Sequence, residues 1–168
     1  MNALYLAEYA EDAVLALAIA SKEAGHLRYT QSTLFTEAID MAWVKALDEN
    51  EERAEKVDAF VGRFGRLQDF IGEKLIPRFA ALLGEKPKSL LDILVFAERM
   101  GWLTGAEDFI AARKLRNLLV HEYMDDEKLF LQSLLSANAA TDVLLAVVKT
   151  MENEAMRLSL PAVDAKTA

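Results

Sequence analysis

The sequence predicts an all-α fold, an up-and-down bundle of about five or six helices. Apolar residues recur at spacings of three and four along nearly the whole chain, which is the period of an amphipathic helix. No alternating apolar and polar run, the pattern of a half-buried strand, persists. A chain of 168 residues can bury a substantial core. We therefore expect one α-helical domain over residues 1–160 and a flexible tail over residues 161–168.

Two helices are expected in the first 50 residues. The first covers about Leu4–Ala24, where Gly25 should end it, and the second covers about Gln31–Leu47 after Thr30, a plausible capping residue. The first stretch has no Lys or Arg before Lys22, and acidic residues interrupt its apolar part. It therefore predicts neither a signal peptide nor a membrane span, and the expected location is the cytoplasm.

A third, longer helix should extend from near Glu51 to about Leu83. Pro77 should kink or split it, because proline lacks an N–H and its ring clashes with the preceding turn. Gly84 should end the helix, since glycine readily adopts the left-handed conformation of a C-terminal cap.

The C-terminal half should contain three further helices. Ser89–Asp92 resembles a capping box and opens a short helix, and Thr104–Glu107 is a clearer capping box. The second box should open a helix over about Gly105–Tyr123. The pair Asp125–Asp126 then supplies a cap for a long last helix that ends near Met156.

Composition limits the classes of function. The sequence contains no cysteine, which excludes disulfides and thiolate metal sites. Glu23 and His26 have the Glu-x-x-His spacing of di-iron bundles, but the other histidine, His121, has Leu118 at the matching position. We therefore expect no metal site and no cofactor, and a surface or helix-end position for His26.

The net charge of −8 argues mildly against a dedicated nucleic-acid-binding protein. The distribution is uneven, however, because residues 63–88 carry six basic and three acidic side chains. Arg63, Arg66 and Lys74 share one stripe of the predicted third helix and could track an RNA backbone. The alternative interpretation of this stripe is an ordinary solvated helix face.

Eight consecutive residues, from Arg116 to Tyr123, carry the most informative chemistry. Arginine stabilises phosphate charge and histidine transfers protons near neutral pH, so Arg116 and His121 together suggest chemistry on a phosphodiester. At 100° per residue, Arg116 and Tyr123 lie within about 20° of each other around the helix, and Asn117 neighbours His121. We expect one arc of the helix to carry these four side chains together with Arg113.

The opposite arc of this helix should face the core through Ala111, Leu115, Leu118 and Leu119. Three apolar residues are expected among the polar groups, namely Phe109, Ile110 and Val120. An exposed face that mixes apolar and functional groups suggests that a second copy of the chain covers it.

A simpler interpretation of the motif is structural. The helix dipole alone favours Arg and His near a helix C-terminus, and His121 could pair with Asp125 four residues later. Tyr123 could lie at the edge of the core with its hydroxyl in water.

More than an isolated pair is present, however. Arg116-Asn117 followed by His121 resembles the motif of the HEPN family of small α-helical domains, which is Arg, four to six residues, then His. A polar residue commonly follows the Arg. The extension from His121 to Tyr123 is similar to the His-x-Tyr motif of HepT-type toxins. The resemblance covers about residues 63–156.

The resemblance implies a metal-independent ribonuclease. His121 would carry protons to and from the RNA, Arg116 would hold the phosphate, and Asn117 would orient one of them. The family's site is composite and forms in the cleft of a homodimer. The resemblance also implies a partner, a minimal nucleotidyltransferase that acts as antitoxin by transferring AMP to the tyrosine at position 123. The alternative is a non-catalytic HEPN protein that binds this enzyme or presents a substrate to it.

Overall fold

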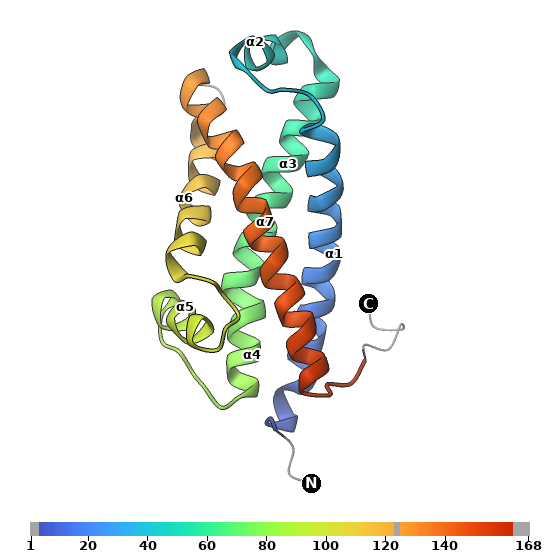
Figure 1. Ribbon diagram of the computed structural model, residues 1–168, viewed down its shortest axis with the longest axis vertical. Coiled ribbons are helices and arrows are strands. Elements are labelled where there is room, and N and C mark those ends of the chain that lie inside the picture. Colours follow the sequence, from blue (N-terminus) through green and yellow to red (C-terminus); the bar gives the residue numbers. More distant parts are fainter. Residues whose placement is uncertain (1–3, 123–124, 163–168) are drawn as a thin grey trace.

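Four long helical rods lie side by side in the computed structural model, which describes residues 4–122 and 125–162 (Figure 1). They run alternately up and down and are formed by α1 (Ala10–Leu34), α3 (Glu51–Phe70) continuing through η3 into α4 (Ile76–Leu82), α6 (Ala106–Glu122) and α7 (Glu127–Arg157). Shorter elements are η1 (Ala7–Tyr9), α2 (Met41–Lys45), η2 (Ala46–Glu49), η3 (Ile71–Leu75) and α5 (Leu90–Arg99). The predicted all-α, up-and-down bundle is confirmed.

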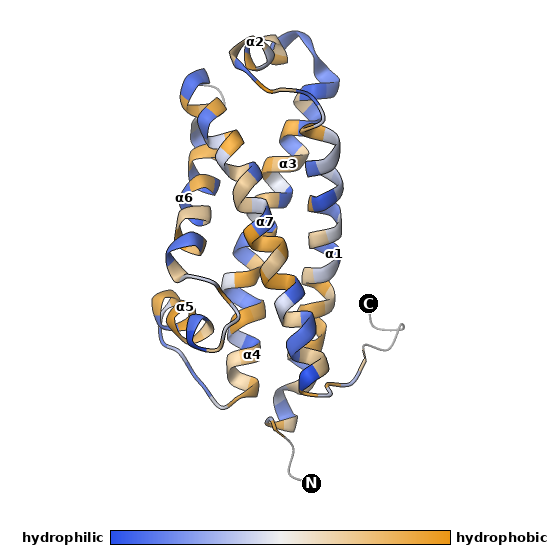
Figure 2. Ribbon diagram, viewed as in Figure 1, coloured by the Kyte–Doolittle hydropathy of each residue, from blue (hydrophilic) through white to orange (hydrophobic). Residues whose placement is uncertain are grey.

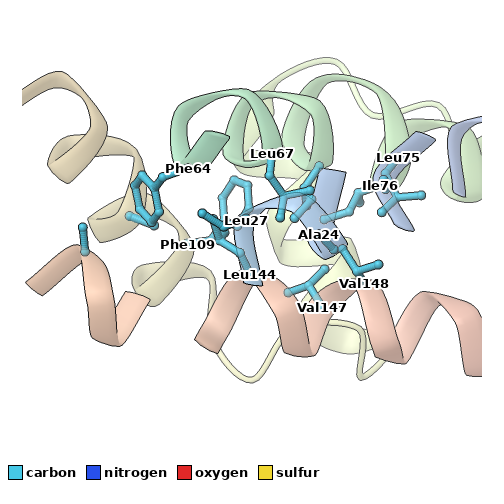
Figure 3. Close-up of a cluster of buried hydrophobic side chains, with 14 of the residues drawn as sticks. Ala24, Leu27, Phe64, Leu67, Leu75, Ile76, Phe109, Leu144, Val147 and Val148 are labelled. Atoms are coloured by element: carbon cyan, nitrogen blue, oxygen red, sulfur yellow. The ribbon is translucent and has the colours of Figure 1, made fainter. Parts of the chain in front are cut away.

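The four rods form a closed ring of neighbours around one core. α1 contacts α3, α3 contacts α6, α6 contacts α7, and α7 returns to α1. Figure 3 shows side chains from all four rods meeting in the core, among them Leu27, Phe64, Phe109 and Leu144. Apolar residues alternate with polar ones along each rod in Figure 2, as expected for helices that bury one side. Removing this apolar surface from water is the main stabilising contribution to the fold.

The first helix differs from its prediction, because α1 passes through Gly25 and ends at Leu34. A glycine in a helix costs roughly 1 kcal/mol relative to alanine, but the buried stripe of α1 continues on both sides of it. Ala24, Leu27 and Thr30 are all buried against the bundle. Packing therefore overrides the local glycine signal, and the predicted second helix over Gln31–Leu47 is wrong.

Residues 35–50 instead fold over one end of the bundle. Asp40 caps the short α2 by accepting from the N–H of Trp43, and Asn50 caps α3 in the same way. The indole N–H of Trp43 donates to Glu37 at 2.9 Å, and Arg53 pairs with the same carboxylate at 3.1 Å. The hydrogen bond from Trp43, followed by that from Arg53, lowers the pKa of Glu37 below its usual 4.5.

Pro77 interrupts the regular α-helix of the rod formed by α3, η3 and α4, as predicted. The turn before it is π-helical, with the N–H of Ile76 donating to the carbonyl of Ile71. This wider turn accommodates a residue that has no N–H and that clashes with a regular preceding turn. Gly84 then ends α4 with φ of +86°, and the predicted stop is confirmed.

The predicted starts of the later helices are largely confirmed. Ser89 accepts from the N–H of Asp92 at the start of α5, and Asp126 accepts from Leu129 at the start of α7. The motif helix α6 begins at Ala106, whose N–H donates to the carboxylate of Glu98 at 3.2 Å. That partner comes from α5, which a local capping box cannot reveal.

By length and composition alone, α7 could cross a membrane, since its most apolar stretch has a mean hydropathy of 1.4. The helix contacts α1, α2, α3 and α6. Its buried residues recur at helical spacing, for example Phe130, Leu134, Leu144 and Met151. The bundle core therefore buries the apolar stripe of α7.

Candidate functional site

The inward side of α6 is rotated from the one that the sequence predicted. Phe109, Ala112 and Leu119 are buried, whereas Ala111 is exposed. The prediction placed Phe109 on the outward face and Ala111 in the core, and both assignments are wrong. The core-facing side of α6 is set by its contact with α3 as well as with α7. A helical wheel shows two apolar arcs on α6, but it cannot identify which of them packs against α3 and α7.

Arg116 lies at the border between α6 and α3. Its Nη2 is 3.4 Å from Oδ2 of Asp69, and its Nη1 donates to Oδ1 of Asn117 at 3.1 Å. The side chains of Arg116 and Asp69 are 38% and 39% exposed, so the ion pair remains in contact with water. The aliphatic part of Arg116 lies over Gly65, where an added Cβ would be 3.2 Å from its Cγ. The guanidinium is therefore held by one residue from α3 and one from α6.

His121 lies in the last turn of α6 and is exposed. Five residues separate it from Arg116, which corresponds to about 140° around the helix axis and about 7.5 Å along it. Between the two directions lie Asn117 and Arg113, both exposed. Within one chain, the imidazole and the guanidinium therefore border the same outward face from opposite sides. Tyr123, the predicted site of modification, lies outside the described residues.

Val120 lies on the same outward side of α6, and the residue is 54% exposed. Ile110 is half-buried and Lys114 is exposed. The mixed apolar and basic character that the sequence predicted for this face is therefore retained, without Phe109.

The three basic residues of the predicted stripe, Arg63, Arg66 and Lys74, differ in their contacts. Arg63 donates to the carbonyl of His26 at 3.1 Å and also to the hydroxyl of Thr30, both on α1. Arg66 pairs with Glu23 of α1 at 3.4 Å. These two arginines tie α3 to α1, which favours the structural interpretation for them. Lys74 is exposed in η3.

No metal centre is indicated in residues 4–122 and 125–162, because no three His, Asp or Glu side chains gather there. Glu23 is engaged by Arg66, and His26 is exposed in the middle of α1 rather than at a helix end. The surface position of His26 agrees with the sequence-based prediction.

Sequence reasoning missed Gly65 and Asp69, the two α3 residues that contact Arg116. A weak signal was present, since a glycine inside an otherwise regular helix often marks a close packing contact. Nothing local identifies the partner, because residues 65 and 116 meet only through the packing of α3 on α6.

An apolar groove with a volume of about 480 Å³ lies between α1 and α7, lined by residues such as Leu17, Ala18 and Met156. Its polar groups include Ser21, which donates to Glu152 at 2.9 Å. It contains no histidine, and its chemistry does not compete with that of α6.

Comparison of the chain with protein-family models, with curated proteins and with solved structures found no match. The function is therefore inferred from the chain's own residues and from the resemblance of its motif.

Proposed function

We propose that this protein is a HEPN-type, metal-independent endoribonuclease that acts as the toxin of a toxin–antitoxin pair in the cytoplasm. The observation that carries the proposal is the grouping on α6. Arg116 and Asn117 are joined by a hydrogen bond of 3.1 Å at the edge of an exposed face that ends in His121. RNA cleavage through the 2′-hydroxyl requires stabilisation of phosphate charge and proton transfer, which an arginine and a histidine can supply.

The proposed reaction is an internal transesterification. A neutral His121 takes the proton from a ribose 2′-hydroxyl, and the 2′-oxygen forms a bond with the adjacent phosphorus. The bond from phosphorus to the 5′-oxygen of the next nucleotide breaks, and this oxygen takes a proton from a protonated histidine. Arg116 stabilises the additional negative charge on the phosphate oxygens in the transition state.

A homodimer would supply both histidines. One chain offers a single His121, which cannot serve as base and acid in the same step. Two α6 helices that face each other across a two-fold axis would place His121 of both copies in one cleft together with Arg116 of both copies. The separation of about 140° between these residues on one helix favours such a composite site. Exposed Val120 supplies apolar surface for the contact.

Regulation follows from the resemblance to HepT-type toxins. A cognate minimal nucleotidyltransferase would transfer AMP from ATP to the hydroxyl of Tyr123 and release pyrophosphate. The added phosphate would place negative charge close to the residues that bind RNA phosphate and would block the site. Intact-mass analysis of the wild type and of Tyr123→Phe after incubation with that enzyme and ATP tests the acceptor. Equal AMP addition to both would exclude Tyr123.

A second candidate function is a non-catalytic HEPN protein that binds the nucleotidyltransferase or presents a substrate to it. The ion pair between Arg116 and Asp69 favours this alternative, because the guanidinium is already engaged by a carboxylate. Toxicity on expression that is lost in His121→Ala distinguishes the nuclease from the non-catalytic protein.

The direct test of the proposed function is cleavage of a single-stranded RNA by purified protein in excess chelator. We expect cleavage by the wild type and a loss of at least about a hundredfold in His121→Ala and in Arg116→Ala. Circular dichroism should show unchanged helix content in both variants. Wild-type rates in both variants would refute the catalytic assignment.

A further inference from the structure

Arg116 packs against α3 at Gly65, which has no side chain. A Cβ on Gly65 would be 3.2 Å from Cγ and 3.4 Å from Nε of Arg116. The first distance is shorter than an ordinary van der Waals contact between carbon atoms. Any other residue at position 65 would therefore require the arginine side chain to shift by a few tenths of an ångström.

One turn further along α3, the carboxylate of Asp69 meets the guanidinium. Asp69 Oδ2 is 3.4 Å from Nη2 of Arg116, while Nη1 donates to Asn117 at 3.1 Å. The two terminal nitrogens are thus directed to partners on two different helices. Gly65 and Asp69 together form what we call the arginine seat.

We propose that Asp69 is a positioning residue, which holds Arg116 in the arginine seat and competes with RNA phosphate for the guanidinium. This inference rests on the proposed function, since it assigns RNA phosphate as the ligand of Arg116. A guanidinium offers carboxylate and phosphate the same pair of parallel N–H groups. The negative charge of Asp69, 3.4 Å from Nη2, therefore neutralises part of the positive charge that a bound phosphate would meet.

The exposure of the pair makes exchange of ligands feasible. Arg116 and Asp69 side chains are 38% and 39% exposed, so the pair is screened by water and salt. Such a pair orients a flexible side chain at modest strength. A phosphate can displace the carboxylate without breaking the packing of α3 on α6.

Removal of the carboxylate charge should therefore strengthen RNA binding through Arg116. Asp69→Asn keeps the shape of the side chain and should lower the dissociation constant for RNA by about two- to fivefold. In an Arg116→Gln background the same substitution should have no effect. Asp69→Glu restores a carboxylate and should bind RNA like the wild type.

The experiment is fluorescence anisotropy with a labelled 2′-O-methyl oligoribonucleotide, which binds but cannot be cleaved through its 2′-oxygen. Glu154→Gln is the matched control, because it removes the carboxylate of another ion pair, that with Arg157 at the far end of α7 (Figure 1). It changes the net charge equally and should leave binding unchanged. Thermal unfolding of each variant checks the fold.

The inference is overturned if Asp69→Asn leaves RNA binding unchanged or weakens it, or if the gain persists without Arg116. Since the probe resists cleavage, a wild type that binds it but cuts no RNA would refute only the catalytic part of the proposed function. A wild type that binds no oligonucleotide would overturn this inference together with the assignment of RNA as ligand.

Discussion

The backbone of Gly65 on α3 and the side chain of Arg116 on α6 are in close contact, with only 3.2 Å available between a Cβ at position 65 and Cγ of the arginine. The same relationship recurs seven residues away along both rods, between Gly72 of η3 and Phe109 of α6. There a Cβ on Gly72 would lie 3.2 Å from Cε1 of the buried Phe109. Two glycines therefore admit two α6 side chains and fix the antiparallel register of α6 along the rod formed by α3, η3 and α4.

Gly65→Ala should separate stability from activity. Alanine favours a helix by roughly 1 kcal/mol over glycine, while the tight contact with Arg116 opposes this gain. We expect a change in unfolding free energy within about 1 kcal/mol, but a loss of RNA cleavage of up to about tenfold, because the arginine side chain has to shift away from α3. Chemical denaturation and cleavage rates measure the two effects.

Gly25→Ala is the control for this prediction. Gly25 lies within α1, and no atom lies within 4 Å of an added Cβ. The substitution should stabilise the protein by about 0.5–1 kcal/mol and leave RNA cleavage unchanged. If both alanine variants cut RNA equally well, the contact at Gly65 does not position Arg116.

Phe109→Ala should remove the anchor of α6 in the core. Phe109 is 1% exposed, and its truncation should cost about 3–5 kcal/mol of unfolding free energy. Leu91→Ala on α5 is the comparison, since Leu91 is 58% exposed and its truncation should change stability by less than about 0.5 kcal/mol. Equal costs in urea denaturation would contradict the burial of Phe109.

The sequence predicted the elements of the bundle that depend on local chemistry. Pro77 and Gly84 act on their own turns, and the caps Ser89 and Asp126 bind N–H groups three residues away. The path of α1 through Gly25 depends on tertiary burial, which outweighs a local penalty of about 1 kcal/mol.

The sequence identifies the residues of the candidate site on α6, but it does not identify the residues that contact them from α3. The motif residues Arg116, Asn117 and His121 follow from sequence spacing on one helix. The partners Gly65 and Asp69 lie about 50 positions earlier in the chain and meet Arg116 only through the packing of α3 on α6. The helical wheel of α6 likewise placed Phe109 on the outward face, because apolar residues occur on two arcs of this helix.

The Glu37 carboxylate should make stability depend on acidic pH. Hydrogen bonds from Trp43 and Arg53 lower the pKa of Glu37 below 4.5 in the folded state. Its contribution to stability is therefore fully present above the usual glutamate pKa and is lost as the pH falls through the lower, folded-state pKa. At pH 7, Glu37→Gln should unfold at a lower temperature than the wild type, and this difference in unfolding temperature should shrink toward pH 3. A difference that stays constant over this range would contradict the assignment.

Val120→Glu should dissociate the proposed homodimer. Val120 is 54% exposed on α6, and a charge buried in a two-fold contact would face its own copy. We expect the wild type to sediment as a dimer at micromolar concentration and the variant as a monomer with unchanged helix content. A monomeric wild type under these conditions would refute the assembly.

The chemistry of the RNA ends tests the central proposal most directly. Wild-type protein, incubated in chelator with a single-stranded RNA, should yield fragments with 2′,3′-cyclic phosphate and 5′-hydroxyl ends by mass spectrometry, because the 2′-oxygen displaces the 5′-oxygen at phosphorus. An oligonucleotide with 2′-deoxyribose throughout should remain intact. Fragments with 3′-hydroxyl and 5′-phosphate ends, or RNA that remains intact with wild-type protein, would contradict a nuclease site built from Arg116 and His121.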